Sequence, residues 1–299
     1  MKTLITGATG LVGSALAPLL TTGGHEVKRL VRRKDPQRSD EILWDPAAGK
    51  LDAAALEGFD AVVHLAGENI AGGRWNEKRK ARIRDSRIQG TRLLSETLAK
   101  LKNPPQTLVC ASAIGYYGDR GTKVLDEESP AGVGFLSDVC RDWEAASSAA
   151  EKAGIRVVRL RLGVVLSPAG GALKQMLLPF KMGVGGRVGS GQQYMSWITL
   201  DDAIGAIHHA LQTESLRGAV NAVAPNPVTN AQFTKSLGRS LHRPTIFPMP
   251  AFAARLAFGE LADALLLSST RVRPVKLLAS GYAFRQSEIE PALRHVFGK

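Results

Sequence analysis

The chain has few cysteines and no long apolar segment. Its two cysteines among 299 residues, Cys110 and Cys140, exclude a disulfide scaffold and are typical of a reducing compartment. The six histidines show no metal-ligand spacing with cysteines or carboxylates, so we expect no metal. No apolar run approaches the length of a membrane span, and a strand predicted from residue 3 leaves no room for a signal peptide. We therefore predict a cytoplasmic protein without a membrane partner.

Acidic and aromatic residues are both scarce. The 27 acidic residues are outnumbered by 39 lysines and arginines, which gives a formal charge of +12, and 6% of the residues are aromatic. Such a charge attracts nucleic acids, membrane surfaces or anionic metabolites. The basic residues gather mainly in residues 29–34 and 78–92, which lack the aromatic interleaving of a single-strand binder. We predict a basic surface that steers a phosphorylated small-molecule substrate, and no nucleic-acid partner.

The first thirteen residues, MKTLITGATGLVG, predict a strand, a glycine turn and a helix. Their glycine spacing is G-x-x-G-x-x-G, not G-x-G-x-x-G, but each glycine has a physical role. Gly7 turns the chain off the strand, Gly10 lets the backbone approach a pyrophosphate, and Gly13 allows close helix–strand packing. The free N–H groups and dipole of the helix that begins at Leu11 favour anions. The alternative is a glycine turn that binds no ligand, but the position of the motif directly after the first strand favours a dinucleotide site over this alternative. The residues predicted to contact a dinucleotide here are Gly7, Thr9, Gly10, Leu11, Val12 and Gly13.

The junction after the second predicted strand, residues 26–31, is basic. An NAD-preferring site places an acid near this point to hold the ribose diol, whereas a basic side chain suits the 2′-phosphate of NADP. Arg32 lies 19 residues beyond Gly13, Arg33 follows it, and no acid precedes them at the strand tip. The sequence therefore predicts NADP as the cofactor, with Arg32 and Arg33 at its extra phosphate. The alternative is two exposed arginines that begin a polar loop.

Apolar runs alternate with amphipathic ones along the first half of the chain. Residues 60–67 and 106–112 predict central strands that are buried on both faces. The first of these ends in Leu65, Ala66 and Gly67, which would let the backbone lie close to the nucleotide. The alternation predicts an α/β fold with a Rossmann-like doubly wound parallel sheet and right-handed crossovers.

The composition changes beyond Gly170. Residues 182–191 are too glycine-rich for a regular element and predict a loop over the crevice. We assign residues 1–168 to an NADP-binding Rossmann domain whose sheet is completed by parts of residues 192–225. Residues 169–299 are assigned to a smaller, mostly helical C-terminal lobe that binds the substrate.

Polar side chains at the end of the strand at residues 106–112 are candidates for catalysis. In a doubly wound sheet the ligand crevice lies outside the carboxyl ends of the strands. Ser112, Tyr116 and Tyr117 are therefore expected to face it. His64 lies inside a strand and is interpreted as a hydrogen-bonded core histidine rather than a base.

Together these segments resemble the short-chain dehydrogenase/reductase superfamily, extended type. More specific runs are similar to an atypical group within it, the YfcH-type sugar-nucleotide epimerase-like proteins. The resemblance implies a Rossmann domain followed by an extra C-terminal domain, which residues 241–244 and 279–284 fit. The segments that carry the resemblance are TGATGLVG at 6–13, HLAGENI at 64–70, RW at 74–75, SR at 86–87, SAIGYYG at 112–118, SGQQY at 190–194 and WITLDD at 197–202.

One departure from the superfamily pattern affects the expected chemistry. Active members use Tyr-x-x-x-Lys, commonly followed by Glu four residues past the Lys. Aligning Glu144 with that Glu puts Leu136 at the Tyr and Cys140 at the Lys. Hydride transfer to a carbonyl needs a proton for the developing alkoxide, which a leucine cannot supply. Cys140 is interpreted as an inert buried thiol.

The resemblance implies an NADP-dependent oxidoreductase or epimerase that acts on a small carbonyl compound or a nucleotide sugar. Ser112 would donate to the substrate oxygen, and Tyr116 or Tyr117 would replace the missing acid unless they only pack against the nicotinamide or the substrate. Glu68, Arg87 and Arg187 are predicted to contact the substrate, and the two arginines would hold an anionic group unless they form surface or interdomain salt bridges.

The absent Tyr and Lys also support a second hypothesis, a non-catalytic NADP-binding sensor or partner-binding protein. The helix predicted at residues 76–101 is a candidate for a homodimer interface of the kind common in the superfamily.

Overall fold

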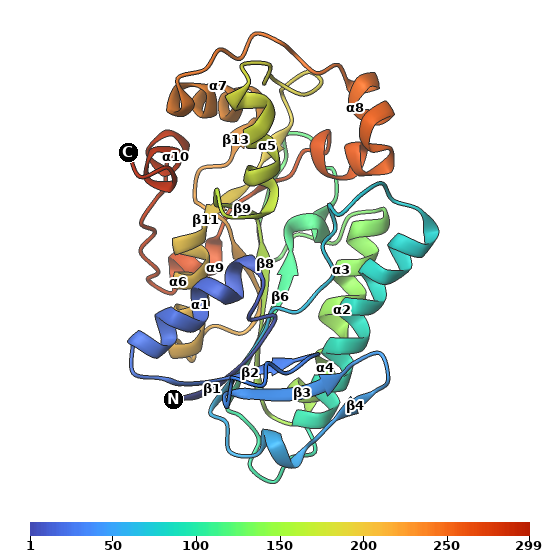
Figure 1. Cartoon of the computed structure of the whole chain (residues 1–299), viewed down its shortest axis with the longest axis vertical. Helices are drawn as coiled ribbons and strands as arrows, with labels where there is room; N and C mark the ends of the chain where they lie inside the picture. The colour runs from blue at the N-terminus through green and yellow to red at the C-terminus, as the bar shows by residue number, and fades with distance from the viewer.

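A computed structural model describes the whole chain, residues 1–299. Its centre is an eight-stranded sheet in the order β4-β3-β2-β1-β5-β6-β8-β12 (Figure 1). All neighbours are parallel except β3 and β4, which are antiparallel. The strands are β1 (Lys2–Thr6), β2 (Glu26–Val31), β3 (Glu41–Asp45), β4 (Lys50–Leu51), β5 (Ala61–His64), β6 (Thr107–Ala113), β8 (Arg156–Leu162) and β12 (Gly218–Ala222).

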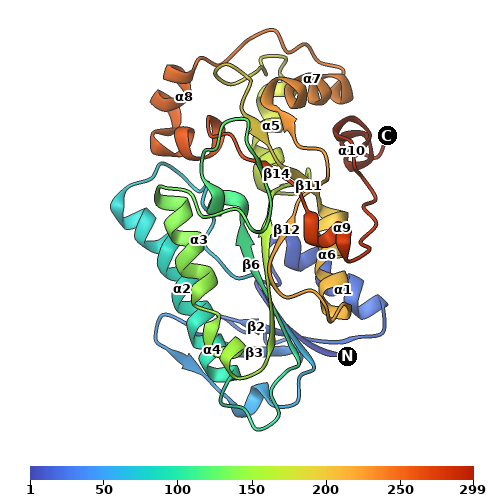
Figure 2. The same ribbon diagram turned by 180° about the vertical axis from the view of Figure 1, so that it is seen from behind.

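Helices cover both faces of this sheet (Figures 1 and 2). Successive strand residues alternate between two cores, because neighbouring side chains of a strand point to opposite faces. Leu4 and Val62 pack in the core under α2 and α4, whereas Ile5 and Val63 pack in the core under α1 and α6. The predicted doubly wound parallel sheet is therefore confirmed. The covering helices are α1 (Leu11–Thr22), α2 (Glu77–Leu98), α3 (Phe135–Ala145), α4 (Ser148–Lys152) and α6 (Leu200–Gln212).

The C-terminal part lies beyond the carboxyl ends of the strands and has a core of its own. Apolar residues of α5, α7 and α10 pack there around Trp197 and Phe233. Three short strand pairs connect this part to the chain below: β9 with β11, β10 with β13, and β7 with β14. These elements are β7 (Val124–Leu125), β9 (Val164–Leu166), β10 (Tyr194–Met195), β11 (Trp197–Thr199), β13 (Val228–Thr229), β14 (Arg271–Val272), α5 (Gly171–Lys181), α7 (Asn230–Leu241), α8 (Ala251–Phe258), α9 (Val275–Ala279) and α10 (Ile289–Val296). None of the helices combines the length and the apolar character that crossing a membrane requires.

The helical segment before β8 is divided into α3 and α4. Arg159 on the adjacent strand causes the division, since its Nε donates to the carbonyl oxygen of Glu144 (3.2 Å) and to Oγ of Ser147 (2.8 Å). The Ser147 hydroxyl donates to the same Glu144 carbonyl (2.7 Å). Side chains therefore occupy a carbonyl that a continuous helix would use for its own ladder.

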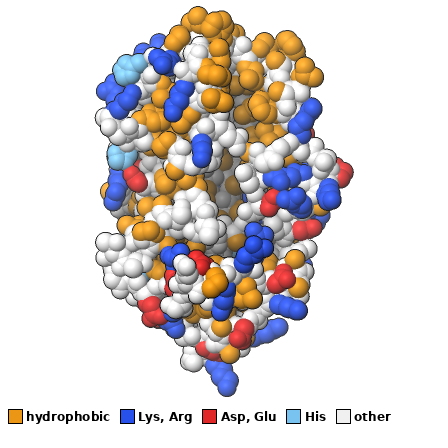
Figure 3. All heavy atoms as spheres, in the orientation of Figure 1, with side chains coloured by type: hydrophobic (Ala, Val, Ile, Leu, Met, Phe, Trp, Pro, Cys, Tyr) orange, Lys and Arg blue, Asp and Glu red, His pale blue; other side chains and the backbone are white.

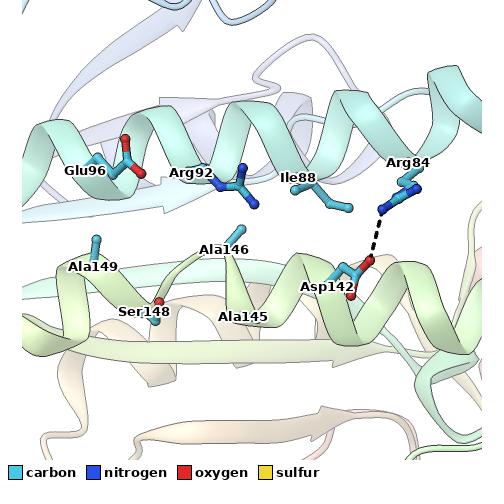
Figure 4. A pocket seen from close by; sticks show the side chains of 9 residues that line it. All are labelled: Arg84, Ile88, Arg92, Glu96, Asp142, Ala145, Ala146, Ser148 and Ala149. Atoms are coloured by element: carbon cyan, nitrogen blue, oxygen red, sulfur yellow. Dashed lines mark ion pairs between the residues drawn. The ribbon is translucent and has the colours of Figure 1, made fainter.

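The outward face of α2 and of the α3–α4 pair carries a shallow polar pocket of about 390 Å³ (Figure 4). Arg84 and Arg92 reach into it from α2, and Arg84 lies 3.6 Å from Asp142 of α3. The pocket lies between helices on their side away from the sheet, so it is separate from the crevice at the strand ends. A homodimer through this helical face stays a prediction.

A buried hydrogen-bond chain joins the ends of β1 and β5 to the helices α2 and α3. The hydroxyl of Thr6 accepts from the backbone N–H groups of Leu65 and Ala66, so its own proton goes to Nδ1 of His64 (2.7 Å). His64 Nε2 therefore carries the proton and donates to Thr91 Oγ1 (2.9 Å), which also accepts from the Trp143 indole N–H (2.9 Å). The prediction that His64 is a bonded core histidine is confirmed.

This chain makes stability depend on pH. Burial lowers the pKa of His64 to about 4, because the charged ring would lose its hydration inside the core. The neutral ring stabilises the fold fully above the unfolded value of 6.5, and that contribution is lost as pH falls from there to about 4. We expect the wild type to lose about 3 kcal/mol more than His64→Gln over this range. Urea unfolding of both proteins at several pH values measures the difference, and parallel pH profiles would contradict the assignment.

Candidate functional site

The glycine turn between β1 and α1 has no room for side chains. Gly7 adopts φ +68°, and a Cβ there would lie 2.7 Å from the carbonyl carbon of Leu65. A Cβ at Gly13 would lie 2.3 Å from the carbonyl oxygen of Gly7, so α1 packs directly on the turn. The N-cap residue Gly10 offers no side chain to the first turn of α1, whose N–H groups stay available to a ligand. The turn therefore fits a pyrophosphate held by backbone N–H groups.

Arg32 and Arg33 follow β2 directly, and both side chains are exposed. Neither forms an ion pair, although two nearby arginines do: Arg29 and Arg38 both pair with Asp40. The local acid is thus engaged by other residues, and two cations without a carboxylate partner stand at the tip of the second strand. This is the environment that a 2′-phosphate requires.

Ser112 lies at the end of β6, but its hydroxyl is not free. The side chain is 2% exposed, and its Oγ donates to Glu144 Oε1 (2.7 Å). Glu144 in turn receives a bidentate pair from Arg161, with Nε to Oε1 at 2.8 Å and Nη2 to Oε2 at 2.9 Å. Burial disfavours the charge on Arg161, but the hydrogen bonds and charge of Glu144 outweigh it and raise the pKa of Arg161. In this geometry the only proton of Ser112 points to Glu144.

The two adjacent tyrosines differ in environment. Tyr117 is fully buried; its hydroxyl donates to Asn221 Oδ1 (2.7 Å) and accepts from Arg161 Nη1 (2.9 Å), and burial raises its pKa to about 12. The expectation that Tyr117 faces the crevice is wrong, because both bonding directions of its hydroxyl are used inside the core. Tyr116 is half-buried, its ring lies against the Arg161 guanidinium (3.5 Å from Cζ to the ring centre), and its hydroxyl bonds to no protein group. Tyr116 is therefore the available phenol.

Leu136 and Cys140 both lie against the turn that carries these tyrosines. A Cβ at Gly115 would lie 3.4 Å from Leu136 Cβ and 3.7 Å from Cys140 Sγ, so one face of α3 presents both to the end of β6. Burial, with the Glu144 carboxylate as the next contribution, raises the pKa of Cys140 to about 12. The interpretation of Cys140 as an inert buried thiol agrees with this environment.

The three residues predicted to contact the substrate lie in different settings. Glu68 is engaged by the protein, because its Oε1 binds Arg79 (3.0 Å) and Arg82 (2.6 Å) of α2. Arg187 is exposed, and the one hydrogen bond of its side chain goes to the carbonyl of Ser190 in the same loop (3.2 Å). Arg87 is half-buried beside Gly67 and has no carboxylate partner. The two arginines thus remain able to bind an anion, whereas Glu68 anchors its loop to α2.

Sequence reasoning missed the buried pair of Glu144 and Arg161. A signal for it existed, since Arg159 and Arg161 interrupt an otherwise apolar strand, RVVRLRL, and charged residues in a buried strand need partners. It also missed that α5 begins against the glycine turn. A Cβ at Gly170 would lie 3.2 Å from Leu11 Cδ1, so the C-terminal part approaches the start of α1 closely. Figure 3 shows a hollow at the centre of this face of the molecule, between the sheet and the C-terminal part.

Two regions of the chain match known family models. Residues 3–222 match the model of the NAD dependent epimerase/dehydratase family. The chain belongs to this family. Residues 249–296 match a second model, described as a domain of unknown function, DUF1731. The predicted resemblance to extended short-chain dehydrogenases with an extra C-terminal domain is thereby confirmed.

Two relatives align with this chain over nearly their whole length, and a third aligns over part of its length. An epimerase family protein of Mycobacterium tuberculosis is 47% identical over 97% of this chain and 95% of its own. The crystal structure of the human epimerase family protein SDR39U1 with NADPH has a TM-score of 0.92 and 37% identity, and the match covers 100% of both chains. A nucleoside-diphosphate sugar epimerase from Corynebacterium glutamicum has a TM-score of 0.81 and 38% identity, with this chain spanning 58% of that one.

Proposed function

We propose that the protein binds NADP(H) and is an oxidoreductase or epimerase for a small carbonyl compound or a nucleotide sugar. The observation that carries the proposal is the glycine turn with an uncapped α1 and two arginines without carboxylate partners at the tip of β2. The NADPH in the human structure supports the cofactor, and the described activity of the Corynebacterium relative supports the nucleotide-sugar class.

The bound cofactor would supply or accept a hydride at a substrate carbon. In the reducing direction, the substrate oxygen gains an electron pair and needs a proton. Tyr116 is the residue of this chain that fits that role, because its hydroxyl is free and it follows the end of β6. Arg161, against the ring of Tyr116, places a positive charge beside the phenol. Ser112 would contribute through Glu144 and the shape of the strand end, not through its own proton.

Replacing Tyr116 by phenylalanine is expected to reduce turnover by about 10²–10⁴-fold, the range for a general acid. The fold should not be affected, because the Tyr116 hydroxyl bonds to no protein group. Tyr117→Phe is the matched control, and it should lower the free energy of unfolding by about 1–3 kcal/mol, because Asn221 Oδ1 loses its donor and Arg161 Nη1 loses the phenol oxygen that accepts from it. Steady-state kinetics and urea unfolding of both variants separate the two roles. Equal turnover in wild type and Tyr116→Phe would contradict the assignment.

The activity itself is tested by mixing the protein with NADPH and a panel of carbonyl compounds and nucleotide sugars. Loss of NADPH absorbance or appearance of an epimerised sugar is the expected result. NADPH binding without any turnover would contradict the catalytic part of the proposal and leave the cofactor part intact.

A second candidate is a non-catalytic NADP-binding sensor or partner-binding protein. One specific observation favours it: Leu136 and Cys140 fill one side of the strand end, and the Ser112 proton is given to Glu144. This candidate predicts tight NADPH binding, no turnover, and a partner that binds in only one redox state of the cofactor. Pull-downs with NADP and with NADPH, compared side by side, test it.

A cytoplasmic location and a homodimer complete the proposal. The helical face in Figure 4 carries exposed charges of both signs, Arg84 and Arg92 with Glu96 and Asp142, which suits a surface that meets its own copy. Sedimentation velocity of the wild type measures the oligomeric state directly.

A further inference from the structure

Arg87 differs from the other arginines in the first half of α2. Arg79 and Arg82 pair with Glu68, and Arg84 lies 3.6 Å from Asp142. Arg87 has no carboxylate within ion-pair distance, although its side chain is half-buried and burial lowers its pKa. An arginine stays protonated even so, which leaves a partly desolvated cation without a counter-ion. Because burial of an unpaired charge is unfavourable, an oxygen of a bound ligand would stabilise this guanidinium.

The guanidinium of Arg87 is held in place by the protein on one side only. Nη1 donates to the carbonyl of Ile83 (3.0 Å), and Cζ lies 5.1 Å from the centre of the Trp143 ring. Nε and Nη2 bond to no protein group, and neither is a buried atom sealed from solvent. Two donors of the guanidinium fork are therefore free and preorganised.

The Trp143 platform beneath Arg87 is itself fixed. The Trp143 indole donates to Thr91, which also binds His64, and His64 binds Thr6 at the end of β1. The same Thr6 hydroxyl accepts from the N–H groups of Leu65 and Ala66. One buried chain thus connects the glycine-turn strand, the end of β5 and the arginine. The position of the guanidinium is set by the elements that form the cofactor crevice.

The order of the strands indicates on which side of the crevice Arg87 lies. In a doubly wound sheet a dinucleotide lies across the point where the strand order reverses, here between β1 and β5. Arg32 and Arg33 follow β2 on one side of this point and would hold the adenosine half. Gly67 lies three residues beyond β5 on the other side, and a Cβ there would lie 3.4 Å from Cζ and 3.5 Å from Nη2 of Arg87.

We propose that Arg87 binds the nicotinamide half of NADP(H), with its free Nε and Nη2 donating to ribose or phosphate oxygens of that half. The inference rests on the proposed function, since it needs NADP(H) in the crevice. It reassigns Arg87 from the substrate to the cofactor. It also gives this chain a cation from α2 where Cys140 of α3, a buried thiol whose pKa is raised, offers none.

The test compares two ligands, NADPH and adenosine 2′,5′-bisphosphate, which carries the adenosine half alone. Arg87→Met keeps an apolar stem over Trp143 and removes the donors. The substitution should weaken the binding of NADPH about 10–100-fold, the range for lost hydrogen bonds to a charged group. The affinity for adenosine 2′,5′-bisphosphate should not change. Arg87→Lys should recover part of the loss, because it restores the charge without the fork. Arg84→Met, on the same helix, is the matched control and should alter neither affinity.

Each other outcome overturns the inference in a recognisable way. Unchanged NADPH affinity in Arg87→Met would show that Arg87 does not bind the cofactor, and its earlier assignment to substrate binding would stand. Equal weakening of both ligands would show that Arg87 acts on the adenosine half or through the fold. If the wild type bound neither ligand, the proposed function would fail together with the inference, and that result is distinct because it appears before any substitution.

Discussion

Replacing Arg161 by methionine is expected to lower the free energy of unfolding by about 3–5 kcal/mol, the range for removing one partner of a buried ion pair. The Arg161 side chain is 4% exposed and that of Glu144 is 12% exposed. The substitution leaves the largely covered Glu144 carboxylate without its cation, and it removes the hydrogen bond to the Tyr117 hydroxyl. Urea unfolding measures the loss.

Two further variants separate the buried charge from a general effect of removing an arginine. Arg255→Met breaks an ion pair with Asp263 in which both side chains are more than half exposed, so it should cost about 0–1 kcal/mol. Adding Glu144→Gln to Arg161→Met removes the uncompensated charge and should recover part of the loss. Similar losses in Arg161→Met and Arg255→Met would contradict the cost expected from leaving Glu144 without its cation.

Gly13→Ala is expected to be severe for both stability and cofactor binding. Its Cβ would lie 2.3 Å from the Gly7 carbonyl oxygen and 2.8 Å from Ala8 Cα, and neither backbone atom can rotate away. Overpacking of this kind costs about 1–3 kcal/mol or more, and the shift of α1 would displace the N–H groups at its start. Thermal unfolding and NADPH titration measure the two effects.

The two glycines that flank α1, Gly10 and Gly23, provide the controls. A Cβ at Gly10 would lie 3.3 Å from its nearest atom, so Gly10→Ala should keep most of the stability. It should still weaken NADPH binding, because the added methyl group occupies the space through which the backbone approaches the pyrophosphate. Gly23, at the far end of α1, has ordinary contacts from 3.4 Å and an ordinary φ, so Gly23→Ala should change neither property. Full stability in Gly13→Ala would contradict the tight turn.

The sequence predicted the features that depend on local pattern. The order of strands and helices follows from apolar runs and glycine turns. The structure keeps this order, and its central strands β1, β5 and β6 are buried on both faces. The glycine turn and the exposed position of Arg32 at the strand tip were predictable because both follow from residues a few positions away.

The direction of individual hydroxyls was not predictable, because distant residues decide it. Glu144, which is paired with Arg161, accepts the hydrogen bond of the Ser112 hydroxyl, and Asn221 accepts that of the Tyr117 hydroxyl. These partners lie too far apart in the sequence for a local pattern to reveal them. The end of α3 likewise depends on Arg159 from a later strand. Adjacent residues such as Tyr116 and Tyr117 therefore look equivalent in the sequence and differ completely in the fold.

Calorimetric titration of the wild type with NADPH and with NADH tests the central claim most directly. Because Arg32 and Arg33 would bind the 2′-phosphate through charge-assisted hydrogen bonds, NADPH should bind about 10–100-fold more tightly than NADH. The Arg32→Ala/Arg33→Ala variant should lose this preference and keep its affinity for NADH. No heat with NADPH, or equal affinities for the two cofactors in the wild type, would contradict the account.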